Sequence, residues 1–182
     1  MNVTKTARRY GSVSIGLHWL MLALLIGVYA CIELREFYPK GSAPREALKD
    51  WHFMLGLTIL ALVGVRLLNR LIERAPAVVP PLPLWQARLA RLIHIALYAL
   101  MIVMPILGWL ILSAAGKPIP FFGLQLPALL AQDKVLADSL EEVHAVIGTI
   151  GYFLIGAHAL AALFHHFITR DNTLLRMLPG GR

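Results

Sequence analysis

Cysteine and charged residues are scarce in this sequence, and both shortages restrict what the chain can be. The 182 residues include one cysteine, Cys31, so no internal disulfide can form, and we expect this thiol to serve in ordinary packing. Charged residues make up 15% of the chain and apolar residues 58%. That balance is too apolar for an ordinary soluble domain. The sequence also has no internal repeat and no low-complexity segment.

Charge is missing altogether from four stretches, which are 10–32, 51–65, 92–116 and 143–169. Three of them exceed the roughly 20 residues that an α-helix needs to cross about 30 Å of hydrocarbon. The second is shorter, but it extends through Leu68 if Arg66 reaches the interface with its long side chain. We therefore predict an all-α fold, a membrane four-helix bundle forming a single domain over 1–182, with helices near 13–34, 50–72, 88–114 and 141–169.

Basic residues are unevenly divided between the segments that flank these helices. The two ends of the chain and the 66–91 connection hold 11 of the 17 basic residues, with only Glu73 and Asp171 as acidic residues. The 33–50 and 117–142 loops hold six basic and eight acidic residues. The positive-inside rule therefore predicts that both termini and the 66–91 connection are cytoplasmic. The net charge of +7 then reflects topology, and we expect lipid rather than nucleic acid as the partner.

Two other segments could be misread as signals or spans. A basic start followed by an apolar run suggests a cleaved signal peptide, but the run is long for one and Tyr29 fits poorly beside the Ala30–Cys31 step. We expect it to remain as the first membrane helix. The 118–132 loop is apolar but is interrupted by prolines, so we expect it to lie in the outer interface without spanning.

Histidines are the polar residues that recur within the predicted spans. His144 and His158 are 14 positions apart on one helix, which places them within about 40° of each other and about 21 Å apart along the axis. Ionisable side chains inside a membrane are costly and therefore indicate function. The helix directions place His52 at the depth of His144, and His18 at the depth of His158.

Facing imidazoles at one depth are the arrangement that bis-histidine haem ligation requires. Small residues one turn from each histidine would leave room for a flat macrocycle, and these are Ser14, Gly56, Gly148 and Ala162. Zinc is a weaker interpretation because it needs three or four clustered ligands. A third interpretation makes these histidines polar packing residues between helices.

Other polar residues admit more than one role. His94 lies near the depth of His18 and could replace it as a ligand, or could simply pack. His165, seven positions after His158, and its neighbour His166 could anchor the helix at the interface, and His165 could instead contribute to a quinone or haem-propionate site. Arg66, Arg70 and Arg170 suit the role of topology determinants, and any of them could pair with a haem propionate.

The residues that carry these patterns resemble the bacterial cytochrome b561 family. The resemblance runs from SIGLHWL at 14–20 through ELREFYP at 33–39 and is sharpest in GYFLIGAHALAALFHHFITRDNTLLRMLP at 151–179. It implies two b haems with His18, His52, His144 and His158 as axial ligands to iron, in a bacterial inner-membrane electron-transport protein that exchanges electrons with the quinone pool. In this family some members are assigned superoxide:ubiquinone oxidoreductase activity, which would make the chain an oxidoreductase.

Three functions follow from these expectations. The first is electron transfer from superoxide at the periplasmic side to ubiquinone near His165, with Arg35, Lys40, Arg45 and Lys49 as a basic patch that would steer the anion. The second is a cytochrome b subunit that anchors a periplasmic dehydrogenase, hydrogenase or other redox protein. The third is a haem-free helical membrane protein. A stable copurifying partner favours the second, and a colourless preparation favours the third.

Overall fold

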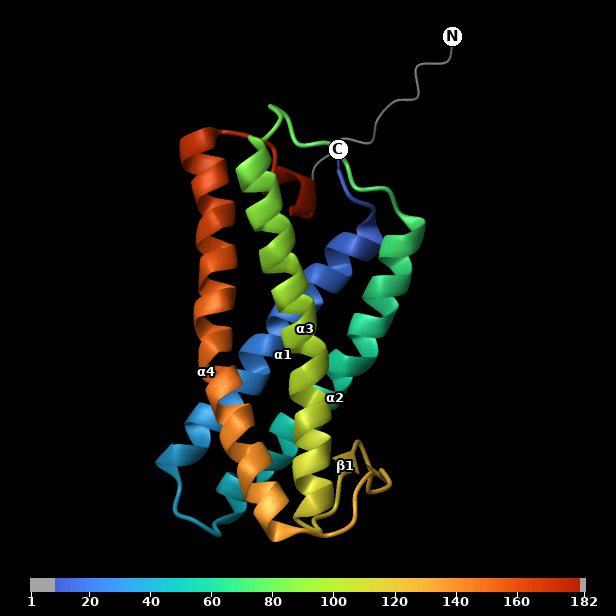
Figure 1. Ribbon diagram of the computed structural model, residues 1–182, viewed down its shortest axis with the longest axis vertical. Coiled ribbons are helices and arrows are strands. Elements are labelled where there is room, and N and C mark those ends of the chain that lie inside the picture. Colours follow the sequence, from blue (N-terminus) through green and yellow to red (C-terminus); the bar gives the residue numbers. More distant parts are fainter. Residues whose placement is uncertain (1–8, 181–182) are drawn as a thin grey trace.

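The computed structural model describes residues 9–180, and four long helices dominate it (Figure 1). They are α1 (Ser12–Leu34), α2 (Ala43–Ile72), α3 (Leu84–Ala114) and α4 (Lys134–Phe164). All four are long and apolar enough to cross a membrane, which confirms the predicted helical, four-span fold. The shorter elements are η1 (Arg35–Phe37), β1 (Pro120–Phe121), β2 (Leu124–Gln125), the π-helical turn η2 (His165–Thr169) and η3 (Leu175–Met177).

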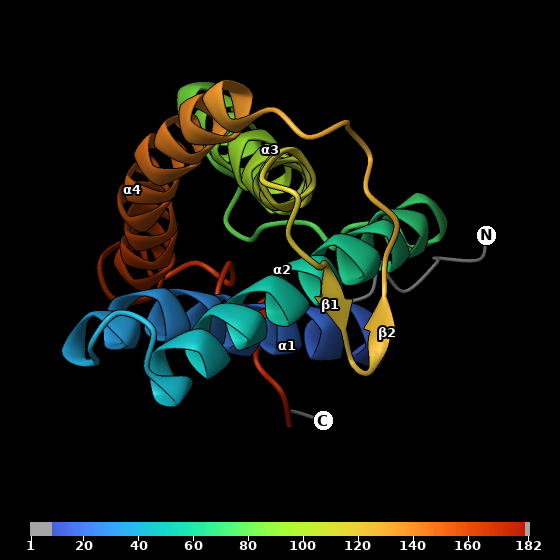
Figure 2. The same cartoon turned by 90° about the horizontal axis from the view of Figure 1, so that it is seen from below.

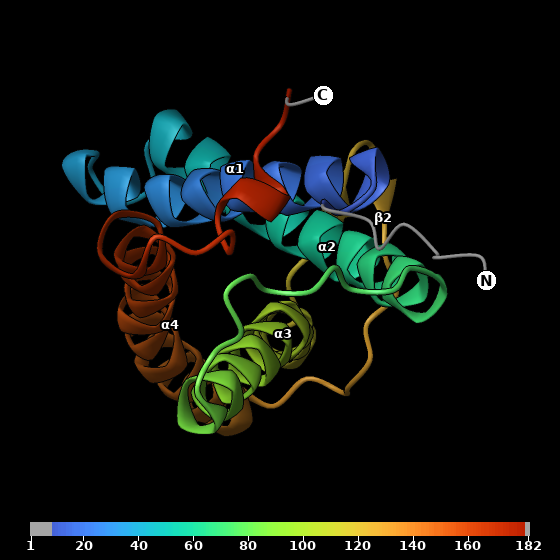
Figure 3. The same ribbon diagram turned by 90° about the horizontal axis from the view of Figure 1, so that it is seen from above.

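The helices pack as two pairs, and one helix of the first pair also contacts one helix of the second. α1 packs against α2, α3 packs against α4, and α2 also contacts α3, as the views along the bundle show (Figures 2 and 3). The buried cores are small: one cluster is Met21, Ile59 and Val63, and the other is Leu57, Leu112 and Ile119. Large apolar side chains instead cover the outside, with Phe153 75% exposed. This inversion is expected for a chain solvated by lipid.

Three helices begin earlier than predicted. In α2 and α4 the added turns contain charged residues, whereas the added turn of α3 is uncharged. α2 begins at Ala43 rather than near residue 50, and it has a proline in its first turn, a position that suits proline. α4 begins at Lys134 rather than near residue 141, and the carboxylate of Asp133 accepts a hydrogen bond from the Leu136 backbone N–H (3.1 Å). α3 begins at Leu84 rather than near residue 88.

The 118–132 loop contains a small β-hairpin that the sequence analysis did not predict. Phe121 pairs with Leu124, and the two residues between them, Phe122 and Gly123, both have positive φ angles of 47° and 85°. Two such residues in succession form the turn that fits a tight hairpin. Buried Ile119 and a hydrogen bond from Trp109 Nε1 to the Pro127 carbonyl (2.9 Å) attach the loop to the bundle.

The first and last described segments meet at one end of the bundle, here called the termini end (Figure 3). The Tyr10 backbone N–H donates to the Arg176 carbonyl (3.2 Å), and Trp19 Nε1 donates to the Met177 carbonyl (2.7 Å). The hairpin and η1 lie at the other end, here called the opposite end (Figure 1). Of the basic residues behind the topology prediction, Lys5, Arg8 and Arg182 lie outside the described residues.

Candidate functional site

Two of the predicted histidines face each other toward the opposite end and form what we call the two-histidine site. The ring centres of His52 on α2 and His144 on α4 are 6.2 Å apart. An imidazole nitrogen lies about 2 Å from a metal ion it binds and the ring centre about 1 Å beyond, so two rings on opposite sides of one ion have centres about 6 Å apart. The spacing therefore fits one iron between the two rings.

The surroundings of this site favour metal ligation through Nε2 of His52. Its Nδ1 is 3.0 Å from the Val28 carbonyl of α1, and a carbonyl can only accept, so Nδ1 carries the hydrogen and Nε2 has the free lone pair. Nδ1 of His144 is buried and has no hydrogen-bond partner among residues 9–180. A Cβ added at Gly56, one turn after His52, would meet no atom within 4 Å, so that face of α2 is open.

Three histidines gather nearer the termini end and form the three-histidine site. His158 on α4 lies 6.2 Å from His18 on α1 and 5.3 Å from His94 on α3, measured between ring centres. The spacing of His18 and His158 thus equals that of the two-histidine site. His94, whose role the sequence left open, lies within the same cluster rather than elsewhere in the bundle.

A cavity of about 380 Å³ adjoins the three-histidine site. Its walls include the small residues Ser14 and Ala162, which are one turn from His18 and His158. The Ser14 hydroxyl donates to the Glu73 carboxylate and accepts from Asn69 Nδ2 (2.7 Å). Apolar side chains of three helices, among them Met21, complete the lining. A flat, mostly apolar group with polar edges is the kind of ligand that such walls accept.

Arg66 brings a guanidinium group into this cavity. Its Nε donates to the Tyr98 hydroxyl (3.1 Å) and its Nη2 donates to Nδ1 of His18 (3.2 Å). Its Nη1 is buried without a hydrogen-bond partner in the described part of the chain. Arg70 also lines the cavity, whereas exposed Arg170 adopts the left-handed conformation just after α4 and η2 (φ 55°). The unpaired donor of Arg66 fits an anionic group such as a propionate.

His165 has a partner that the sequence analysis missed. Its Nδ1 lies 2.5 Å from Oδ2 of Asp171, a residue that is only 4% exposed. Burial works to raise the pKa of Asp171, but contacts from Thr173 and His165 outweigh it and lower that pKa below its usual value. His166 instead lies against Phe167, with ring centres 4.7 Å apart. The acidic residue in the TRDN sequence after a membrane helix was the available signal for Asp171.

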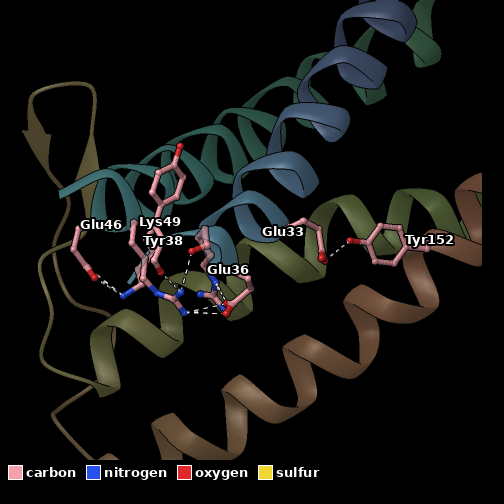
Figure 4. A network of polar contacts seen from close by, with 8 residues as sticks. Glu33, Glu36, Tyr38, Glu46, Lys49 and Tyr152 are labelled. Atoms are coloured by element: carbon pink, nitrogen blue, oxygen red, sulfur yellow. Dashed lines mark hydrogen bonds and ion pairs between the residues drawn. The ribbon is translucent and has the colours of Figure 1, made fainter. Parts of the chain in front are cut away.

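The basic patch expected at the opposite end is partly offset, because three of its four members, Arg35, Arg45 and Lys49, pair with two glutamates. Arg35 and Arg45 both pair with Glu36, and Lys49 pairs with Glu46 (Figure 4). Arg45 is 7% exposed and donates to the carbonyls of Arg35 (2.9 Å) and Tyr38 (3.0 Å). A buried arginine is costly unless its donors are satisfied, and Arg45 satisfies its donors on the loop between α1 and α2. These contacts hold the loop in place.

Comparisons with known proteins agree with this architecture. Residues 9–180 match the family described as prokaryotic cytochrome b561. The chain is 38% identical to cytochrome b561 homolog 1 of Escherichia coli K12, over 94% of this chain and 97% of that protein. It is 41% identical to a probable superoxide oxidase CybB of Yersinia pestis, over 96% and 98% of the two chains. Cytochrome b561 homolog 2 of E. coli K12 is 33% identical over 98% and 95%.

Proposed function

The chain belongs to the prokaryotic cytochrome b561 family, and on that premise we propose that it oxidises superoxide on the periplasmic side of the bacterial inner membrane and reduces ubiquinone. The family and the four spans make it a bacterial membrane protein that binds b-type haem and works in electron transport. Two haems per chain, the substrates and the sidedness are the new elements of the proposal.

One observation carries the proposal: α4 presents two histidines at different depths, and each faces a histidine of another helix at 6.2 Å. His52 and His144 would hold one haem, and His18 and His158 the other. Two bound haems supply one-electron carriers at two levels of the bilayer. The protein's part would be to hold each haem between two histidines and to exclude water.

His18 is preferred to His94 as the partner of His158. The 6.2 Å spacing of His18 and His158 matches two rings on one iron, whereas the 5.3 Å spacing of His94 and His158 is short for it. Ligation through Nε2 of His18 leaves a hydrogen on Nδ1, which then cannot accept from Arg66. Arg66 is then free to donate to a haem propionate, and Arg70 lies in the same cavity wall.

The distribution of charge supports cytoplasmic termini. The 66–91 connection and both ends of the chain are rich in arginine and lysine, and the connection and both described ends lie at the termini end (Figure 1). By the positive-inside rule this end faces the cytoplasm, so the two-histidine site lies nearer the periplasm. Quinone reduction at His165, at the termini end, then takes its protons from the cytoplasm.

The overall reaction balances as two one-electron oxidations and one two-electron reduction. Two superoxide anions each lose an electron to give two molecules of oxygen, and ubiquinone gains the two electrons and two protons to give ubiquinol. A haem iron held by a histidine on each side would have no open position, so superoxide would give up its electron without binding to the metal. Because two glutamates offset part of the basic patch, we expect the loops of the opposite end to steer superoxide only weakly.

The decisive experiment combines haem counting with an activity assay on the purified full-length protein. We expect a pyridine haemochrome assay to give two b haems per chain, and superoxide to drive ubiquinol formation that superoxide dismutase abolishes. His165→Gln should remove most quinone reduction, and the adjacent His166→Gln, as a matched control, should not. One haem per chain would refute the paired ligation. Activity that needs a copurifying periplasmic protein would favour the anchor-subunit alternative.

A further inference from the structure

The π-helical turn after α4 brings a buried carboxylate back onto His165. Within η2 the chain widens its helical turn, and Arg170 then takes a left-handed conformation (φ 55°). The Asp171 backbone N–H consequently donates to the His165 carbonyl (3.1 Å), six residues back. π-helical turns are uncommon and are found frequently at functional sites.

From this geometry we propose that Asp171 is a positioning residue that fixes the tautomer of His165, so that Nε2 of His165 exchanges protons with a quinone. The inference rests on the proposed function, because it needs quinone reduction near His165. It adds the residue that orients the histidine and the atom that carries the proton.

The two carboxylate oxygens of Asp171 have separate partners. Oδ1 accepts from the Thr173 backbone N–H (2.8 Å), and Oδ2 lies 2.5 Å from Nδ1 of His165. The lowered pKa of Asp171 keeps it ionised at neutral pH, and an ionised carboxylate can only accept a hydrogen bond. Nδ1 of His165 must therefore carry the hydrogen, which leaves Nε2 as the position that gains and loses a proton.

A second contact restricts the imidazole further. The Thr169 hydroxyl donates to the His165 carbonyl (3.0 Å) and also lies 3.3 Å from Nδ1. The Asp171 side chain is almost fully buried, with 1% of it exposed, whereas that of His165 is 14% exposed. A carboxylate removed from water in this way is costly unless it is paired, and Oδ2 finds its partner in His165. The contact of Oδ1 with the Thr173 backbone N–H would be enough if Asp171 only ended the helix, so the contact of Oδ2 with His165 indicates a further role.

The His165–Asp171 pair lies beside the cavity of the three-histidine site. Ala162, three residues before His165, lines that cavity, and so do Thr173 and Leu174, which follow Asp171. The His165–Asp171 pair is thus held between two stretches of chain that form the cavity wall. A quinone at this wall would lie next to the electron donor and next to the imidazole.

The proton step is simple to balance. Ubiquinone takes up two electrons, one from each superoxide oxidised, and two protons to become ubiquinol. In each half of the reaction the His165 imidazolium gives the proton on Nε2 to a quinone oxygen and becomes neutral, and water at the termini end returns a proton to Nε2. Asp171 stays ionised and offsets the positive charge of the imidazolium.

The test compares Asp171→Asn and Asp171→Glu with Asp133→Asn in the full-length holoprotein. Asp133→Asn is a matched control because it makes the same change at the opposite end, where asparagine also caps a helix. Dithionite-reduced protein is mixed with a short-chain ubiquinone analogue or with ferricyanide, which takes up electrons without protons, and haem reoxidation is followed by absorbance.

We expect Asp171→Asn to slow quinone-driven reoxidation at saturating quinone by about 10- to 100-fold, with KM nearly unchanged and a larger solvent deuterium isotope effect. Reoxidation by ferricyanide and the haem spectrum should stay as in the wild type, and Asp171→Glu should recover part of the rate. Equal losses with both oxidants would show a structural role and overturn the inference. Normal quinone kinetics in Asp171→Asn, with a defect in His165→Gln, would overturn this inference alone. Normal kinetics in His165→Gln would overturn the proposed quinone site as well.

Discussion

The two-histidine site and the three-histidine site have the same 6.2 Å spacing but differ in their surroundings. His52 and His144 come from two helices, and a backbone carbonyl orients His52. At the three-histidine site α1, α3 and α4 each supply an imidazole, and α2 supplies a guanidinium group. That site also adjoins a cavity of about 380 Å³.

If each site holds a haem, as proposed, this contrast would give the two haems different properties. Axial ligands of the same type set a common starting point, and burial, nearby charge and hydrogen bonds then shift each potential. At the two-histidine site a backbone carbonyl orients the His52 ring, and side-chain substitutions alter a backbone group little. At the three-histidine site a side chain, that of Arg66, contacts the His18 ring, so substitutions can change how that ring is held. This site also contains a third histidine, His94.

The largest expected effect is at the two-histidine site. His144→Ala should reduce the haem content from two per chain to one. Among the described residues, His144 is the one histidine on another helix whose ring faces His52 at metal-ligating distance. The pyridine haemochrome assay measures this, and superoxide should then no longer reduce the haem that remains. Two haems in this variant would show that His144 is not a ligand.

A smaller effect is expected for His18→Ala, because His94 can move into its place. The ring centre of His94 is 5.3 Å from that of His158, less than about 1 Å from the spacing that ligation requires. We expect most of the second haem to remain, with a shifted absorption spectrum, and the double variant His18→Ala, His94→Ala to lose it. If His18→Ala alone loses as much haem as His144→Ala, His94 does not replace His18 as a ligand.

The smallest effect is expected for Arg66→Gln, which removes a positive charge beside the three-histidine site. A nearby cation favours the reduced haem, so the midpoint potential of one of the two components should fall by about 20 to 60 mV, and the other should stay in place. A potentiometric titration with optical detection measures both. Arg88→Gln is the matched control, since Arg88 is exposed in the first turns of α3 at the same end. Equal shifts in both components would show that Arg66 does not act specifically on the haem of the three-histidine site.

The helices and the approximate depth of each histidine could be predicted because a membrane simplifies the problem. Charge-free runs of about 20 residues identify spans, and the alternating direction of four spans then assigns a depth to every residue. This reasoning matches His52 with His144, and in the structure their rings face each other 6.2 Å apart. The start of α4 was misplaced by the same logic, because hydrocarbon ends where the charges begin but Asp133 starts the helix further out.

Side-chain partners at the two ends could not be predicted in this way. Depth does not show that Arg45 turns inward to hold two carbonyls, or that Lys49 is paired with Glu46. The link between Asp171 and His165 depends on a π-helical turn and one left-handed residue, and both are decided by local packing rather than by hydropathy. Similarly, the turn at Phe122 and Gly123 requires φ angles that the apolar composition of the loop does not indicate.

The meeting of the first and last described segments has a consequence for biogenesis. Leu174 and Met177 form part of the wall beside His18, and the Met177 carbonyl holds Trp19 of α1. These residues are translated after all four helices, so this part of the wall is added after the rest. We therefore expect the pocket beside His18 to mature after membrane insertion. The site of His52 and His144 uses residues that are translated earlier, so if both sites bind haem as proposed, we expect this one to be loaded first.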